Sequence, residues 1–299
     1  LPIMTKAEDR TKRIVAFDKY MLEDIGHYKF DVLGLETLPI IKSCLDSIKR
    51  VEGVDVDLYN INYDDKNIYE MLCKGFVSGV FQLNNQAQKV MEQQPSNFKD
   101  LIAINALIRP GVGNWQEYID RRKGKHWEVH PNRLAYMEET SGTMTYQEQF
   151  LLDCKTFAGW DIAFADGKVR KNKNIMEDFE LREKFYTDCK ARGVDESIIE
   201  CLWTDICNAV SGGYSFNKSH SATYAMTSFQ TAHLKYYYPE HFYASLMSAE
   251  STDGDGQIMI GNYIMECKQR GINILPPDIN ISNDNFVVTD KGITYRITA

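Results

Sequence analysis

A long amphipathic segment in the last third of the chain is the feature that most constrains the fold. From Ser219 onward, small and aromatic side chains recur at three- and four-residue steps, at Ala222, Ala225, Phe229, Ala232 and Tyr236. This spacing predicts one helix with one apolar face. Pro239 ends that helix and starts a second one, which is predicted to reach Met247.

Helical periodicity dominates most of the chain. A helix is predicted over Leu35–Val51 and ends near Gly53. Further helices, each bounded by Gly, Pro or Asn, are predicted over Asp65–Cys73, Asn85–Gln93, Phe98–Leu107 and Trp115–Lys123. Capping-box spacing, Thr145 with Glu148 and Asn174 with Glu177, predicts two more helices that reach Ala158 and about Arg192.

Short strands are predicted at both ends of the chain. Ile14–Phe17 and Tyr28–Leu33 flank an acidic helical turn at Asp18–Asp24. Near the carboxyl terminus, a loop at Ser251–Gly256 and a helix at Ile258–Arg270 precede a hairpin of Phe286–Thr289 with Ile293–Ile297. The fold class is therefore α+β: a small α/β portion, then a mostly helical body, with short strands near the carboxyl terminus.

Composition indicates a soluble, cytoplasmic protein. No run of about 18 apolar residues occurs, which argues against a membrane span. The seven cysteines are scattered without a C-x-x-C pair, as is typical of reduced, mostly buried thiols. The net charge of −8 hides two basic clusters, which consist of Lys168, Arg170, Lys171 and Lys173, and of Arg121, Arg122, Lys123 and Lys125. Each can bind polyanions locally, although a solvated face is the commoner explanation of such clusters.

Asp31 is a candidate metal ligand because it lies in the apolar stretch Tyr28–Leu35. Burying a carboxylate is costly unless it is paired or binds a metal. Two-metal phosphoryl transfer uses carboxylates on a rigid strand to hold Mg²⁺ ions. On the pattern alone, a carboxylate that caps the following helix is the commoner explanation of such a residue.

A glycine-rich turn leads into the long helix. Gly212-Gly213-Tyr214-Ser215-Phe216-Asn217-Lys218-Ser219-His220 combines a glycine pair, a helix amino terminus and a lysine, which together suit an anion. The spacing is not that of a P-loop, so a Walker-type NTPase is not indicated. Taken alone, this stretch fits an ordinary capped turn, and Lys168–Lys173 fits a solvated basic loop.

Six motifs, taken in order, resemble the C-family replicative DNA polymerases, that is, the bacterial DNA polymerase III alpha subunits. The motifs are Lys29–Leu35, Val80–Leu83, Ile104–Gly111, Thr145–Gln149, Phe216–His220 and Leu275–Asn280. The resemblance covers the chain from about Ile14 onward. It implies that residues 1–50 are the end of a palm domain and that residues 51–299 are a fingers domain.

The resemblance also implies a site. Asp31 corresponds to one of three catalytic carboxylates that hold Mg²⁺. The expected contacts of the incoming dNTP are Arg170, Lys218, Ser219 and His220, with further phosphate contacts from Lys168, Lys171 and Lys173. DNA primer-template is the other expected ligand. The sliding clamp and other replisome subunits would bind parts of the protein outside this chain.

Two departures from the family pattern affect these expectations. The family has two adjacent arginines in the basic stretch, whereas this chain has only Arg170, set among lysines. The other two catalytic carboxylates belong to a palm motif upstream of this segment, so the isolated chain is expected to be an inactive fragment of a DNA-directed DNA polymerase. The alternatives are a non-catalytic nucleotide- or nucleic-acid-binding module derived from such a polymerase, and an unrelated helical scaffold.

Overall fold

The computed structural model describes residues 1–28, 30, 34–108, 115–172, 174–211, 215–251 and 253–297. They form two compact units, Leu1–Pro39 and Ile40–Ala299, each with its own internal contacts. The predicted α+β class is confirmed, because helices dominate the described chain and short strands occur near both ends.

The first unit contains an antiparallel hairpin and a short helix. Strand β1 (Ile3–Lys6) pairs with β2 (Asp9–Val15). Helix α1 (Lys19–Asp24) follows, and the predicted helical turn is thus confirmed. The strand predicted over Ile14–Phe17 is wrong in position, because β2 begins at Asp9 and ends at Val15. Most of β2 is polar and exposed, so backbone pairing forms it without the alternating apolar pattern that marks a half-buried strand.

The strand expected over Tyr28–Leu33 lies mostly outside the described residues, and so does Asp31. Helix α2 (Thr37–Glu52) agrees with the predicted helix to within two residues at either end and stops before Gly53, whose φ of +71° ends it. In the second unit, Ile41, Cys44 and Ile48 of α2 share an apolar cluster with helices α13 (Pro239–Ala249) and α14 (Gly254–Gln269).

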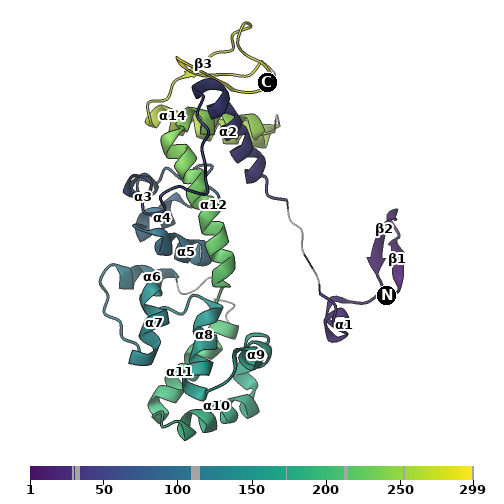
Figure 1. Cartoon of the computed structure of the whole chain (residues 1–299), viewed down its shortest axis with the longest axis vertical. Coiled ribbons are helices and arrows are strands. Elements are labelled where there is room, and N and C mark those ends of the chain that lie inside the picture. Colours follow the sequence, from purple (N-terminus) through teal and green to yellow (C-terminus); the bar gives the residue numbers. More distant parts are fainter. Residues whose placement is uncertain are drawn as a thin grey trace. The chain divides into compact units, whose positions relative to one another are not determined.

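The second unit is mostly helical (Figure 1). Its first helices are α3 (Lys66–Cys73), α4 (Ala87–Gln93), α5 (Phe98–Leu107) and α6 (Trp115–Arg122). Helix α4 begins two residues later than predicted, since Asn85 has a φ of +65° and cannot continue a helix. The short helix α7 (Leu134–Met137) lies between the 3-10 turns Pro131–Arg133 and Glu138–Thr140.

The next helices are α8 (Gln147–Asp153, continued by a π-helical turn at Cys154–Ala158), α9 (Ile162–Ala165, continued by a π-helical turn at Asp166–Arg170), α10 (Phe179–Ala191) and α11 (Glu196–Ser211). Among them, the two that capping-box spacing predicted, α8 and α10, begin at other residues than expected. Thr145 does not cap α8. Asn174 does not cap α10 either, because Ile175–Glu177 is a 3-10 turn and Asp178 accepts the N–H of Leu181 at 3.0 Å.

Helix α12 (Lys218–Tyr237) confirms the predicted amphipathic run. Ala225, Phe229 and Ala232 are buried in an apolar cluster with residues of α3, α4 and α5. Figure 1 shows α12 as the long helix of the second unit, and it packs along α5. Burial of this face fixes the helix axis.

A second buried face of α12 is polar, which the periodicity did not predict. The Ser221 hydroxyl donates to the carbonyl of Ile102 at 2.6 Å, and that of Ser228 donates to the carbonyl of Phe81 at 2.9 Å. The Phe81 N–H donates to the Thr231 hydroxyl at 3.1 Å. These bonds fix the rotation of α12 about its axis, because each satisfies a buried polar group.

Two further clusters complete the core. One joins α8, α9, α10 and α11, and the other joins α2, α13, α14 and the last strands. Strands β3 (Ile274–Leu275), β4 (Val287–Thr289) and β5 (Gly292–Thr294) form a sheet in the order β3-β5-β4. The predicted hairpin is thus confirmed, whereas the parallel β3–β5 pair was not predicted. Helix α14 begins at Gly254, inside the predicted loop, since Asp253 caps it.

All seven cysteines are free, and five are buried, as expected for reduced thiols. Within the described ranges, no helix has both the length and the hydropathy that crossing a membrane requires.

Candidate functional site at the start of α12

Two of the sequence motifs meet at the start of α12. Phe216 pairs with Tyr146 in a parallel bridge. The Phe216 N–H donates to the carbonyl of Thr145, and the Gln147 N–H donates to the carbonyl of Phe216, both at 2.9 Å. The motifs Thr145–Gln149 and Phe216–His220 are therefore held together by backbone hydrogen bonds although about 70 residues separate them in sequence.

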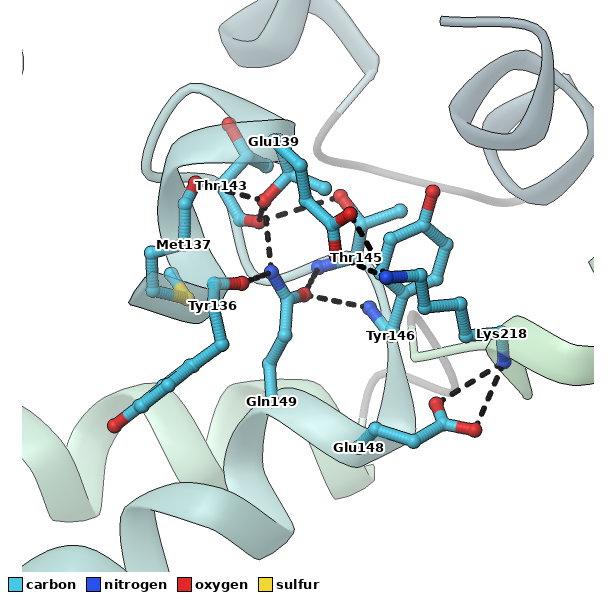
Figure 2. A network of polar contacts seen from close by, with 10 residues as sticks. Tyr136, Met137, Glu139, Thr143, Thr145, Tyr146, Glu148, Gln149 and Lys218 are labelled. Atoms are coloured by element: carbon cyan, nitrogen blue, oxygen red, sulfur yellow. Dashed lines mark hydrogen bonds and ion pairs between the residues drawn. The ribbon is translucent and has the colours of Figure 1, made fainter. Parts of the chain in front are cut away.

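The amino terminus of α12 is bound to a carboxylate. Asn217 caps the helix by accepting the N–H of His220 at 2.8 Å. The two oxygens of Glu148 accept the N–H of Lys218 at 3.1 and 3.0 Å (Figure 2). Free N–H groups and the helix dipole both favour an anion at this position. Glu148 therefore does not make the capping box predicted with Thr145.

The ammonium of Lys218 contacts a second carboxylate. It donates to the two oxygens of Glu139 at 2.6 and 2.8 Å and lies 5.6 Å from the centre of the Tyr146 ring. Figure 2 shows Glu139, Tyr146 and Lys218 side by side. The Lys218 side chain is 39% exposed, so it can also be reached from solvent. Burial raises the pKa of Tyr146 well above its ordinary value, so its ring stays neutral beside the cation.

Gln149 organises the backbone around this ion pair (Figure 2). Its amide oxygen accepts the N–H groups of Thr145 and Tyr146, each at 2.7 Å. Its amide nitrogen donates to the carbonyl of Tyr136 at 2.9 Å and to the hydroxyl of Thr140 at 2.8 Å. The buried amide thereby uses its full set of two donors and two accepting positions.

A row of aromatic rings runs along the same end of α12. The exposed ring of His220 lies 5.2 Å from that of Phe216 and 4.2 Å from that of Tyr224. Tyr224 in turn lies 5.1 Å from Phe81 of the motif Val80–Leu83. Ser219 is exposed beside His220, and its carbonyl accepts the Thr223 hydroxyl at 3.0 Å. Lys218, Ser219 and His220 are thus at one accessible helix end.

The basic stretch lies on the π-helical turn that follows α9 and packs on α8. Arg170 forms an ion pair with Asp166, in which Nη2 and Oδ2 are 3.0 Å apart. Hydrogen bonding to Arg170 holds the pKa of Asp166 below its ordinary value. Lys168 and Lys171 are exposed, and Lys173 lies outside the described residues. No hydrogen bond or ion pair within the described part of the chain joins this stretch to Lys218.

The second basic cluster is largely paired with acids. Arg121 and Lys125 both bind Glu117, and Arg122 donates to Asp100 with its Nη2 at 2.9 Å. These contacts favour a structural role for Arg121 and Arg122, whose side chains are half-buried. Sequence reasoning missed Glu139, and no local pattern marks it, since its partner Lys218 lies 79 residues away.

Comparison with known proteins identifies the family. The family model described as the bacterial DNA polymerase III alpha subunit finger domain matches residues 37–193, from α2 through α10. The chain belongs to the bacterial DNA polymerase III alpha subunit family. The expected domain limits, 1–50 for the palm end and 51–299 for the fingers, stay a prediction.

Relatives of this family align along the whole chain. The DNA polymerase III alpha subunits of Mycobacterium tuberculosis and Thermus aquaticus are each 33% identical over 100% of this chain. The alignment covers 26% of the Mycobacterium tuberculosis protein and 25% of the Thermus aquaticus protein. That of Bacillus subtilis is 33% identical over 93% of the chain and 25% of the relative. The chain spans about a quarter of the length of these curated relatives.

The described residues contain no cluster that matches the expected Mg²⁺ site. Across residues 1–28, 30, 34–108, 115–172, 174–211, 215–251 and 253–297, no group of three or more His, Cys, Asp or Glu side chains could hold a metal ion. Asp31 is not among these residues, and its role as a ligand stays a prediction.

Proposed function

We propose that the chain is a segment of a DNA-directed DNA polymerase and that the start of α12 binds the triphosphate of the incoming dNTP. One observation carries this proposal. Both the Lys218 ammonium and the first N–H of α12 are bound to carboxylates of the chain itself, so this position attracts anionic oxygens. A triphosphate offers the same kind of oxygen at higher charge.

The remaining roles are those that the resemblance to the family implies. Ser219 and His220 are beside Lys218 at the exposed helix end, where the sugar and phosphates of a nucleotide would lie. Arg170, with Lys168, Lys171 and Lys173, would supply further phosphate contacts from the basic stretch. Asp31 would contribute one Mg²⁺ ligand to nucleotidyl transfer on a primer-template, and that metal would activate the primer hydroxyl.

The proposal is tested by replacing the ammonium of Lys218 with the thioether of methionine, which has a similar length but no charge. In the polymerase that contains this chain, Lys218→Met should weaken dNTP affinity about ten- to a hundredfold, because a charge-assisted hydrogen bond contributes roughly 1.5–3 kcal/mol. The dissociation constant of a dNTP from the enzyme–primer-template complex is measured by single-turnover kinetics.

Lys184→Met is the matched control. Lys184 also forms an ion pair, with Asp188 at 2.8 Å, but it lies on α10 rather than on α12. Its replacement should leave dNTP affinity unchanged within about twofold, since an exposed ion pair contributes little. Equal losses in the two variants would contradict the proposal.

Arg170 should make a more specific phosphate contact than its lysine neighbours. Asp166 engages Nε and Nη2 of Arg170, which leaves Nη1 for a phosphate and holds the fork in one orientation. Arg170→Lys should lower the catalytic efficiency for a single dNTP roughly tenfold or more, whereas Lys171→Ala should lower it less. A larger loss for Lys171→Ala than for Arg170→Lys would rule out this assignment.

A further inference from the structure

Glu139 contacts Lys218 across a long sequence separation. It lies in the 3-10 turn Glu138–Thr140, whereas Lys218 is the first residue of α12. Its side chain is only 19% exposed, and both of its oxygens accept from the Lys218 ammonium. The pair is therefore a tertiary contact that fixes the lysine against another segment of the chain.

The segment that carries Glu139 is held in place by contacts of its neighbouring residues. The Gln149 amide holds the residues on both sides of Glu139, through the Tyr136 carbonyl and the Thr140 hydroxyl. Arg133, in the preceding turn, forms a buried ion pair with Asp153 of α8 at 2.9 Å. A segment that is already ordered loses little entropy when its carboxylate binds a cation, so the pair contributes more than one between two mobile side chains.

The ammonium keeps capacity for another ligand. A lysine ammonium has three N–H donors. The two carboxylate oxygens of Glu139 accept from the Lys218 ammonium, and the Tyr146 ring lies 5.6 Å away. The Lys218 side chain remains 39% exposed. An incoming phosphate oxygen can therefore join the ammonium without displacing Glu139.

We infer that Glu139 is a positioning residue: it orients the Lys218 ammonium beside the amino terminus of α12 so that a triphosphate meets a preoriented cation. A carboxylate that orients a phosphate-binding lysine is a known arrangement in phosphoryl transfer. This inference rests on the proposed function, and it adds a residue that contacts no substrate and acts through Lys218.

The experiment is a double-mutant cycle in the polymerase that contains this chain, with Glu139→Gln, Lys218→Met and the double variant. Glu139→Gln should raise the KM for dNTP about three- to tenfold, the range expected for two directly coupled residues. It should change kcat by less than about twofold, because uniform binding is lost rather than transition-state stabilisation. In the Lys218→Met background, Glu139→Gln should have no further effect on KM.

Glu138→Gln is the matched control. Glu138 is the adjacent acid and is exposed, so its replacement removes the same charge without touching Lys218. It should leave KM unchanged. Thermal melts of all variants are compared with that of the wild type. If Glu139→Gln melts lower, Glu139→Asp, which keeps the charge but shortens the side chain, replaces it in the cycle with the same expected rise in KM.

The outcomes separate the two proposals. A lower KM for Glu139→Gln means that Glu139 competes with the triphosphate, and this overturns the inference alone. Equal effects of Glu139→Gln in both backgrounds mean that Glu139 acts without Lys218, which also overturns the inference alone. A wild-type KM for Lys218→Met overturns the proposed function and the inference with it.

Discussion

Asp31→Asn in the polymerase that contains this chain should reduce nucleotide incorporation about a thousandfold or more. Asp31 is the carboxylate in the apolar motif Lys29–Leu35, which resembles the catalytic strand of the family. A catalytic metal contributes several kcal/mol to the transition state, and about 1.4 kcal/mol corresponds to a factor of ten in rate. Asparagine keeps the shape of the side chain but removes the charge that holds the cation.

The measurement separates catalysis from binding. Single-nucleotide incorporation is measured at saturating dNTP, and primer-template affinity is measured in the same samples. The affinity for primer-template should change by less than about twofold, since contacts with the phosphate backbone of the DNA dominate DNA binding. Asp46→Asn removes an exposed carboxylate of α2 and should leave both quantities unchanged. Incorporation by Asp31→Asn within tenfold of the wild type would show that Asp31 is not a ligand of the catalytic metal.

Lys235→Met should destabilise the chain by about 3–5 kcal/mol, because it leaves the buried carboxylate of Glu266 without its cation. Lys235 is fully buried at the end of α12 and donates to the carbonyl of Ser78 at 2.7 Å. Burial lowers the pKa of Lys235 to about 8, although the attraction of Glu266 opposes that shift. The ammonium thus joins α12 to α14 and to the turn before Val80.

Urea unfolding of the chain checks this expectation. The midpoint should fall while the slope of the free energy of unfolding with urea stays constant. Lys268→Met, an exposed lysine on α14, should change the free energy by less than about 0.5 kcal/mol. A loss of less than about 1 kcal/mol in the free energy of unfolding of Lys235→Met would contradict this expectation. It would show that the hydrogen bond from Tyr243 is enough to stabilise the buried carboxylate of Glu266.

Local patterns in the sequence predicted most of the helical framework. The apolar face of α12 was visible because Ala225, Phe229 and Ala232 recur with the period of a helix, and these residues are buried. The adjacent polar face was not visible. Ser228 and Lys235 are buried only because loop carbonyls and Glu266 satisfy them, and no periodicity encodes partners so distant in sequence.

The same limit applies to the candidate site. The motif Phe216–His220 located Lys218 correctly at a helix start. Its partner Glu139 lies in a segment of short turns, which has no sustained period to reveal it. The predicted capping role of Glu148 failed because its carboxylate binds the N–H of Lys218, and Gln149 binds the N–H groups before α8 instead. Spacing within one segment cannot distinguish these uses.

Photo-crosslinking tests the placement of the triphosphate most directly. A dNTP that carries an aryl azide on its γ-phosphate is bound to the enzyme–primer-template complex and irradiated, and the labelled peptides are identified by mass spectrometry. The label should fall within residues 136–149 and 215–224, and excess unmodified dNTP should remove it. Label confined to α10 or to the sheet β3-β5-β4, with none in those two segments, would contradict binding at the start of α12.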